Sequence, residues 1–216
     1  KISMAEYNKL YEVPIHLEGY DPTYKGHQGQ IKKAATLIKN AKRPLIIAGA
    51  GVLKSGAMDE LKELAEKAQI PVTNTLVGLG GFPGDHELAL GMVGMHGSVA
   101  ANNSTDEADL VIAAGIRFHD RITGHPDFFC KKAKIIHIDI DPAEIDKNVT
   151  INVPIVGDLK QVLTELNALV EPTTHEAWLE QIREWQAEYP MVIPESKNDV
   201  LHAQYVLSEL NKIAKD

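Results

Sequence analysis

The chain has 216 residues, of which 44% are hydrophobic and 24% charged, enough for one well-buried α/β domain with additional segments but too few for two domains of ordinary size. Its net charge of -8 and pI near 5.6 argue against a surface for nucleic acid or an anionic membrane, since either needs a basic patch, and favour a small-molecule ligand. The sequence has no apolar run near the ~18 residues of a membrane span and no signal-peptide pattern. Its single cysteine allows neither an internal disulfide nor a CxxC site. We therefore expect a soluble cytoplasmic protein.

The first third of the chain predicts a lead-in, a helix, a strand and a second helix. Residues 1–26 contain four tyrosines and two prolines with little periodicity, and we interpret them as a linker. Apolar residues at helical spacing predict a helix over 28–41, and the apolar run 45–48 predicts the first strand. Gly49-Ala50-Gly51 ends that strand, and a helix follows over about 57–68. A strand, a glycine turn and a helix in this order let a backbone approach a phosphate.

The middle of the chain continues to alternate strands with helices. A strand over 70–73 is followed by a glycine-rich connection over 76–97, which we expect to be a long functional loop. Ser98 begins a helix, and Asp158, with Gln161 three residues later, caps another. Further strands are predicted over 110–114, 134–139 and 149–156. This alternation predicts an α/β fold with a doubly wound, mostly parallel sheet flanked by helices.

The pattern changes in the last quarter of the chain. Thr174 is expected to cap a helix whose apolar face carries Ala177, Trp178, Ile182 and Trp185. A domain boundary is expected near 190–199, and a last helix over 202–215 has no following strand to pack against. Both ends therefore suggest a middle domain of a longer polypeptide. The expected parts are a linker over 1–26, a central domain over 27–190, and a linker with the first helix of another domain over 191–216.

Two arginines follow the most strongly apolar strand. The strand over 110–114 ends in Gly115, and Arg117 and Arg121 come directly after it, four residues apart. Open α/β sheets bind ligands at the carboxyl ends of their strands, and guanidinium groups suit phosphates or carboxylates. We therefore expect an anion-binding pair here. The alternative is that the arginines are solvated or paired with carboxylates such as Asp120.

Other candidate residues have both a functional and a structural interpretation. Gly49-Ala50-Gly51 lacks the third glycine of the dinucleotide fingerprint, and no acidic residue ends the second strand, which disfavours a standard NAD site. Asp139 and Asp141 follow a strand, where a carboxylate can accept hydrogen bonds from ribose hydroxyls or cap a helix before Pro142. No histidine or cysteine stands at a zinc-binding spacing, so we predict no metal site.

Several segments together resemble one family of enzymes. They are GAGV at 49–52, TLVGLGGFPG at 75–84, GMVGMHG at 91–97, GIRFHDRITG at 115–124 and IDIDPAEIDKN at 138–148. In order and spacing they are similar to the central domain of the acetohydroxyacid (acetolactate) synthase catalytic subunit, and the resemblance extends from about residue 19 to about residue 163. The GMHG and RFxDR segments make it specific among thiamine diphosphate enzymes.

The resemblance implies a Rossmann-like central domain of a three-domain transferase. Such an enzyme condenses two pyruvates to 2-acetolactate with release of CO2, or pyruvate with 2-oxobutyrate, in branched-chain amino-acid biosynthesis. It uses thiamine diphosphate and Mg²⁺, and its middle domain binds FAD in a mainly structural role. The activating glutamate and the metal-binding motif belong to the preceding pyrimidine-binding domain and the following diphosphate-binding domain. The fragment alone is therefore expected to be inactive, with no catalytic residue. The expected partners are those other domains, further copies of the chain and a regulatory small subunit, with no nucleic acid or membrane.

The resemblance also implies a set of FAD-binding residues. The adenosine diphosphate half of FAD is expected at Gly49, Ala50 and Gly51, and its adenosine end at Asp139 and Ile140. The flavin is expected to run along Thr75 and Leu76, with its ring system near Met95 and His96. Gly115, Arg117 and Arg121 are expected to belong to the same site, and Gly157 and Asp158 to close its far side. One position departs from the family, because His119 stands where RFDDR has its first aspartate.

Two alternatives stay open. One is a ligand-free scaffold domain of another thiamine diphosphate enzyme, against which the presence of Arg117, Asp120 and Arg121 argues. The other is an NAD-binding deacylase-like domain, which usually carries a small zinc module that a single cysteine cannot build. Bound flavin would distinguish the proposed family from both.

Overall fold

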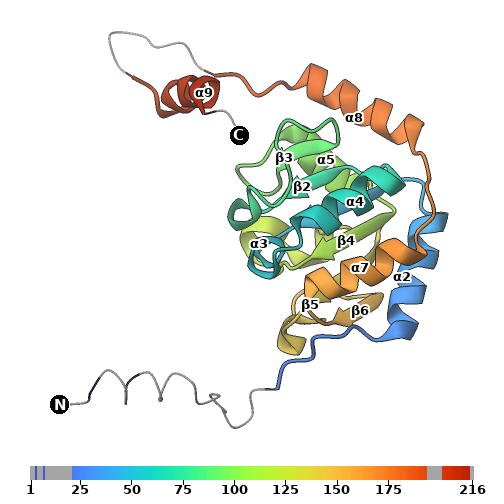
Figure 1. The fold of residues 1–216 in the computed structure, drawn as a ribbon. Coiled ribbons are helices and arrows are strands. Elements are labelled where there is room, and N and C mark those ends of the chain that lie inside the picture. The colour runs from blue at the N-terminus through green and yellow to red at the C-terminus, as the bar shows by residue number, and fades with distance from the viewer. Residues whose placement is uncertain (1–2, 4–6, 8–20, 194–200, 215–216) are drawn as a thin grey trace.

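The computed structural model of this chain describes Ser3, Tyr7 and residues 21–193 and 201–214. A six-stranded sheet runs through it, in the order β3-β2-β1-β4-β5-β6 (Figure 1). Its strands are β1 (Pro44–Ala48), β2 (Val72–Asn74), β3 (Ala89–Met92), β4 (Leu110–Ala114), β5 (Lys134–Asp139) and β6 (Val153–Val156). All neighbouring strands pair in parallel, so the predicted doubly wound α/β fold is confirmed. The strand order reverses between β1 and β4, which is where such folds form their ligand crevice.

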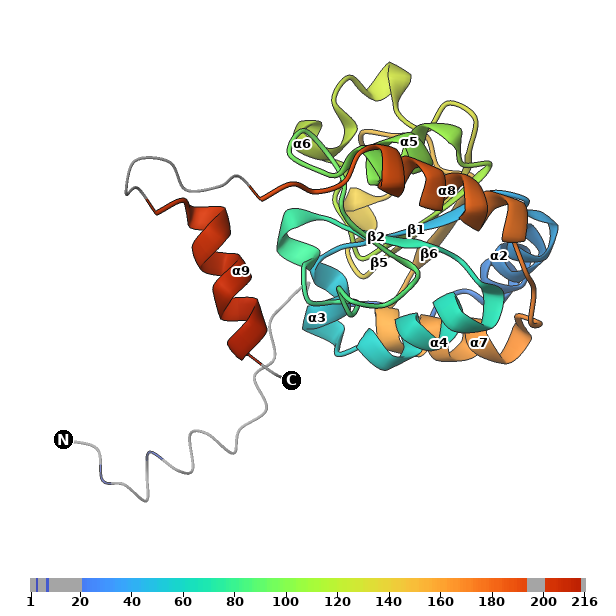
Figure 2. The same cartoon turned by 90° about the horizontal axis from the view of Figure 1, so that it is seen from above.

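Helices cover both faces of the sheet (Figure 2). One face carries α2 (Gln28–Asn40), α3 (Ala50–Ser55), α4 (Met58–Ala68) and α7 (Leu159–Leu169). The other carries α5 (Val99–Glu107) and α8 (Glu176–Glu188). Shorter elements are η1 (Leu76–Gly78), α6 (Asp120–Thr123), η2 (Pro126–Phe128) and η3 (Pro142–Glu144), and α9 (Ala203–Ile213) follows α8.

The strand sequences explain the two cores. Successive strand side chains point to opposite faces, so a strand covered by helices on both sides is apolar throughout. Ile46 and Ile112 enter the core under α2, α4 and α7, whereas Ile47 and Val111 enter the core under α5 and α8. The central strands β1 and β4 are buried at every position, which is why their apolar runs were readable in the sequence.

The connection over 76–97 is not only a loop, because it contains the edge strand β3. This prediction was wrong for a physical reason: β3 is four residues long, includes Gly91, and pairs with β2 alone, through an irregular register. Short edge strands need no continuous apolar run, since one side of the strand lacks a partner. The sheet therefore has six strands where the sequence predicted five.

Three other expectations need correction. The last strand begins at Val153, not at residue 149. Helix α8 begins after His175 with no side-chain cap, so Thr174 is not its N-cap. On its apolar face Leu179 is buried, whereas Ala177, which was expected there, is exposed. A short helix, α3, follows β1 directly and was not predicted.

The ends of the chain lie mostly outside the described residues. Of the predicted N-terminal linker, residues 21–26 are described, and they run against the start of α7, where the Asp158 backbone N–H donates to the Tyr24 carbonyl. The expected boundary at 190–199 falls largely on residues that are not described. Helix α9 lies apart from the sheet and buries no side chain (Figure 1). No described helix has the length and apolar character needed to cross a membrane.

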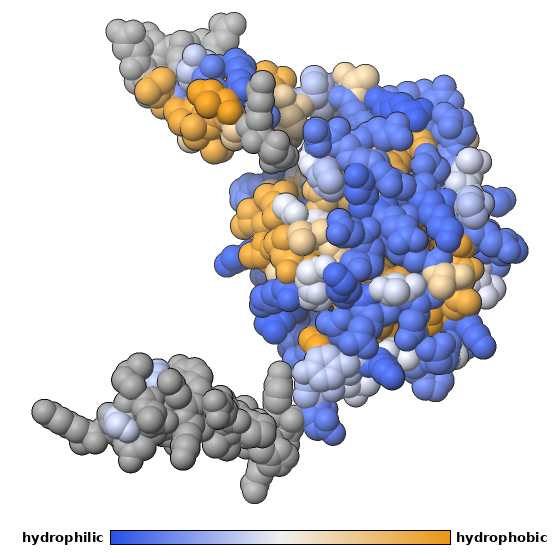
Figure 3. Space-filling view, viewed as in Figure 1, coloured by the Kyte–Doolittle hydropathy of each residue, from blue (hydrophilic) through white to orange (hydrophobic). Residues whose placement is uncertain are grey.

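Apolar side chains also gather on the surface near the carboxyl ends of β1 and β2. Figure 3 shows them at the edge of the domain where α3 and the loop after β2 lie. We call Leu53, Leu76, Val77 and Leu79 the apolar edge, and all four are exposed.

Candidate functional site

Two glycine turns touch each other where β1 and β4 end. The Gly51 backbone N–H donates to the Gly115 carbonyl at 3.0 Å, and the Gly49 N–H donates to the Ala114 carbonyl at 2.9 Å. A Cβ on Gly49 would lie 2.3 Å from the Gly115 oxygen, and one on Gly51 would lie 2.5 Å from the Gly115 Cα. Gly115 itself has φ of 60°, a conformation that favours glycine. These glycines are therefore required first for the contact between two backbone turns.

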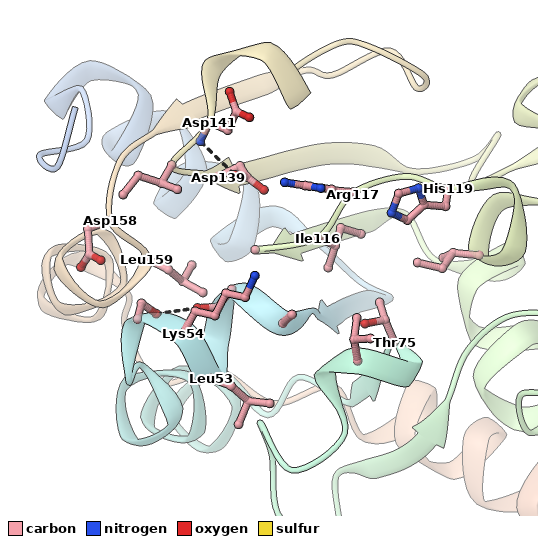
Figure 4. Close-up of a pocket in the computed structure, with 17 residues that line it drawn as sticks. Leu53, Lys54, Thr75, Ile116, Arg117, His119, Asp139, Asp141, Asp158 and Leu159 are labelled. Carbon is pink, nitrogen blue, oxygen red and sulfur yellow. Dashed lines mark hydrogen bonds between the residues drawn. The ribbon is translucent and has the colours of Figure 1, made fainter. Parts of the chain in front are cut away.

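A cavity of about 610 Å³ opens beside this contact, at the carboxyl edge of the sheet (Figure 4). The turns after β1, β2, β4, β5 and β6 all contribute to its walls. It is lined by eight of the residues predicted to bind a cofactor, namely Ala50, Gly51, Thr75, Gly115, Arg117, Asp139, Ile140 and Asp158. The fold thus brings together segments more than a hundred residues apart at the expected place.

Six predicted residues do not line this cavity: Gly49, Leu76, Met95, His96, Arg121 and Gly157. Two of them serve backbone packing, because a Cβ on Gly157 would lie 2.9 Å from the Gly26 nitrogen, much as at Gly49. Leu76, Met95 and His96 are exposed. Arg121 lines a different hollow, of about 520 Å³, together with Met95. The structure therefore does not bring Arg117 and Arg121 together in one cavity.

The cavity carries two cationic side chains on opposite walls. Arg117 comes from the loop after β4, where its side chain is 60% exposed and its Nε lies 3.8 Å from Glu144 Oε1. Lys54 comes from α3, and among the described residues its ammonium has no ion-pair or hydrogen-bond partner. Sequence reasoning missed Lys54 because α3 was not predicted. Its place one turn after the Gly49-Ala50-Gly51 bend was the available signal.

Three carboxylates line the cavity from the ends of β5 and β6. Each uses one oxygen to accept a hydrogen bond from a backbone N–H: Asp139 from Asp141 at 2.9 Å, Asp141 from Ala143 at 3.0 Å, and Asp158 from Gln161 at 3.1 Å. The capping predicted for Asp141 and Asp158 is thus confirmed. The second oxygen of each makes no hydrogen bond within the described residues, and Figure 4 shows the Asp139 carboxylate facing the space beside Arg117, where it can accept one from a ligand hydroxyl.

Thr75 presents a buried hydroxyl to the cavity. The residue is 3% exposed, it lines the cavity, and its Oγ1 has no hydrogen-bond partner among the described residues. Buried polar atoms are nearly always hydrogen-bonded, so an unpartnered hydroxyl at a cavity wall fits a polar group of a ligand. This observation is independent of the charges.

The loop that carries Arg117 is held from beneath. His137 on β5 is buried and its Nε2 donates to the Ile116 carbonyl at 2.9 Å, while Asn148 Nδ2 donates to the Phe118 carbonyl at 2.7 Å. Burial lowers the pKa of His137, although the Ile116 carbonyl and Asp139 act in the opposite direction. A neutral imidazole that donates through Nε2 is consistent with both facts. The carbonyls on either side of Arg117 are therefore fixed by side chains from β5 and the segment after it.

The remaining candidates show less chemistry. His119 lines the cavity and precedes α6 without capping it. Cys130 is buried, and burial raises the pKa of its thiol far above the usual value, as in an unreactive thiol. Within residues 21–193 and 201–214, no three histidine, cysteine or acidic side chains are grouped as metal ligands would be.

Comparison with known proteins agrees with this geometry. The chain matches the family described as "Thiamine pyrophosphate enzyme, central domain" over residues 31–166. It is 56% identical over 179 residues to the "Probable acetolactate synthase large subunit" of Methanocaldococcus jannaschii, which covers 81% of this chain and 30% of that protein. It is 42% identical over 216 residues to the "Acetolactate synthase large subunit" of Corynebacterium glutamicum, covering 98% of this chain and 34% of that protein.

The match is thus to one part of these relatives, since the chain spans about a third of their length. Residues 31–166, which match the family, include every strand of the sheet and every turn that lines the cavity. The chain therefore belongs to the thiamine pyrophosphate enzymes and carries their central domain.

Proposed function

We propose that this chain is the FAD-binding central domain of an acetolactate synthase. In the proposed reaction two pyruvate anions and one proton give 2-acetolactate and CO2, so the bond to one carboxylate carbon breaks and a new carbon–carbon bond forms. Relatives named acetolactate synthase large subunit, at 41% to 58% identity, support this assignment.

The cavity at the reversal of strand order is the observation that carries the FAD assignment. It offers cationic side chains on opposite walls, carboxylates on the walls at β5 and β6, and an unpartnered hydroxyl on Thr75. A dinucleotide needs this combination, because its phosphates are anionic and its ribose hydroxyls donate hydrogen bonds. In our proposal Arg117 binds phosphate oxygens, and Asp139 and Asp158 accept hydrogen bonds from hydroxyls.

The rest of the enzyme is part of the same proposal. Thiamine diphosphate with Mg²⁺ supplies the carbon–carbon bond-forming chemistry when bound, and its ligands come from other domains. FAD has a mainly structural role. We also propose a cytoplasmic enzyme whose chain associates with further copies of itself and with a regulatory small subunit.

The test is flavin content together with activity in the full-length protein. We expect a visible flavin band after purification and acetolactate formation from pyruvate. Replacing Arg117 by Ala should weaken FAD binding about tenfold, because a charge-assisted hydrogen bond is lost. Arg183→Ala is the matched control, since Arg183 is equally exposed but lies on α8 and pairs with Glu176.

The outcomes separate the alternatives. Activity without flavin would support a scaffold domain that has no ligand. Flavin binding that is unchanged in Arg117→Ala would mean that Arg117 serves its ion pair with Glu144 rather than a phosphate.

A further inference from the structure

Lys54 is an unpaired cation at the mouth of the cavity. It stands on the second half of α3, and Figure 4 shows its ammonium directed into the space between the walls, on the side opposite Arg117. Lys160, which lies near the end of α3, is already engaged, because its Nζ lies 3.2 Å from the Gly56 carbonyl and 3.4 Å from Glu60 Oε1. Of these two lysines, only Lys54 keeps all three ammonium protons for a ligand or solvent.

The backbone at this turn offers little to an anion. The Gly51 N–H is bonded to the Gly115 carbonyl, and the Val52 N–H is bonded to the Gly49 carbonyl. These are the amides that a glycine turn commonly directs at a phosphate. A phosphate held here receives neither of these two amides and therefore depends more on side-chain cations.

The charged side chains of the cavity come from different walls, and Figure 4 shows the Arg117 side chain directed toward Asp139. Asp139, Asp141 and Asp158 stand on the walls formed by β5 and β6, and their first oxygens are turned to backbone amides. Lys54 and Arg117 stand on the walls formed by the turns after β1 and β4. An anion bound between these two cations has compensating charge on both sides, and the diphosphate of a dinucleotide carries two negative charges for two cations.

We propose that Lys54 is a diphosphate-binding residue, which holds the phosphate oxygens from α3 while Arg117 holds them from the loop after β4. This inference rests on the proposed function, because it assumes that the cavity takes a dinucleotide. Arg117 presents a planar fork with fixed directions, whereas Lys54 acts as a mobile point charge on a long stem. Lys54 and Arg117 together bind the two adjacent phosphates, and the backbone N–H of Gly51 takes no part.

The test compares Lys54→Met with wild type in the full-length protein after its flavin has been removed. FAD and ADP are titrated at about 0.05 M and about 0.5 M salt, where the Debye length falls from roughly 14 Å to roughly 4 Å. We expect Lys54→Met to lose about tenfold in affinity for both ligands at the lower salt concentration. At the higher salt concentration the difference between variant and wild type should shrink to about twofold, since screening weakens the contribution of the lysine. Lys54→Arg should keep most of the affinity.

Lys160→Met is the matched control, because it removes a positive charge next to Leu159, which lines the cavity, from a lysine that already has partners. The inference is overturned if Lys54→Met binds both ligands like wild type, if its loss is the same at both salt concentrations, or if Lys160→Met loses as much. If wild type binds FAD while Lys54→Met shows one of these results, only the inference fails. If wild type binds neither FAD nor ADP, the proposed function fails with it.

Discussion

Gly49, Gly51 and Gly115 let two turns of backbone touch beside the cavity. A side chain at any of the three would separate the ends of β1 and β4, which are the strands on either side of the reversal in strand order. The pattern Gly49-Ala50-Gly51 resembles a phosphate-binding turn, but in this structure its glycines are explained by the contact with the turn at Gly115. The ligand then meets the side chains around that contact.

We expect Gly49→Ala to destabilise the protein by roughly 2 kcal/mol or more. Its Cβ would lie 2.3 Å from a carbonyl oxygen of the backbone, which cannot move without displacing the turn after β4. Gly84→Ala is the control, because no atom lies within 4 Å of a Cβ there and its φ is not positive. Urea unfolding measures both. Equal stability of the two variants would contradict the close contact.

His137 should make the protein less stable in mild acid. Burial lowers its pKa from the usual 6.5, so between the folded and unfolded pKa values the unfolded chain holds more protons. The free energy of unfolding therefore falls as pH drops below about 6.5. The groups that face the imidazole are the Ile116 carbonyl, Asp139 and the ring of Phe118.

The measurement is the urea midpoint at about pH 7.5 and about pH 5.5 in wild type and in His137→Gln, whose amide can still donate to Ile116. The fall between the two pH values should be smaller in the variant. Some fall should remain, because burial also lowers the pKa of His175. A variant with the full pH dependence of wild type would rule out His137 as its source.

Residue positions at strand ends could be predicted from the sequence, but side-chain directions could not. Arg117 and Asp139 were placed at the carboxyl edge because an apolar run before each of them marks a buried strand. Arg121 was expected beside Arg117, yet the chain turns into α6 between them and Arg121 lines the other hollow. A spacing of four residues has a fixed meaning only within a continuous helix.

At the scale of elements, α7 connects the cavity to the core. Its N-cap, Asp158, lines the cavity, and its apolar face begins at the next residue, with Leu159, Val162 and Leu163 buried against the sheet. The cap was predicted because a capping pattern is local in sequence. A substitution at Asp158 can therefore affect folding and ligand binding separately.

We expect Asp158→Ala to lower the free energy of unfolding by about 1 kcal/mol, because the Gln161 N–H loses its partner. Asp158→Asn should cost much less, since asparagine caps a helix about as well as aspartate. Chemical denaturation without ligand tests this pair of variants. If both cost the same, the charge of the carboxylate rather than the cap would determine the stability.

The strands differ in how well the sequence predicted them. The predicted bounds of β4 and β5 agree with the structure, since both are interior strands with neighbours on two sides. The two edge strands were predicted less well, because β3 was missed and β6 was expected to begin four residues too early. Strand bounds were predicted best where both faces and both edges of a strand are covered, although the interior strand β2 was expected over 70–73 and runs over Val72–Asn74.

At the scale of the whole molecule, the apolar edge is uncovered. Leu76 and Val77 are both 68% exposed, next to a cavity that we assign to FAD. A flavin ring lying along these residues would be enclosed on one side only by this chain. Burial of about 100 Å² less apolar surface costs about 2.5 kcal/mol at about 25 cal/mol per Å².

The chain of 216 residues by itself should therefore bind FAD and ADP with similar, weak affinity and purify nearly colourless. It should also form no acetolactate when pyruvate, thiamine diphosphate and Mg²⁺ are added. Calorimetric titration with FAD and with ADP checks the first expectation. Strong preference for FAD over ADP would show that this chain encloses the flavin without further walls.

The two tryptophans of the chain are an intrinsic fluorescence probe at the opposite end of β1 from the cavity. Both stand on α8, where Trp178 is buried and donates from Nε1 to the carbonyl of Pro44, the first residue of β1, and packs edge to face against Trp185. The cavity opens at the other end of β1. The tryptophan emission maximum of this chain therefore reports whether α8 is packed against the sheet. A shift of that maximum during denaturation marks the release of α8 rather than the loss of a cofactor.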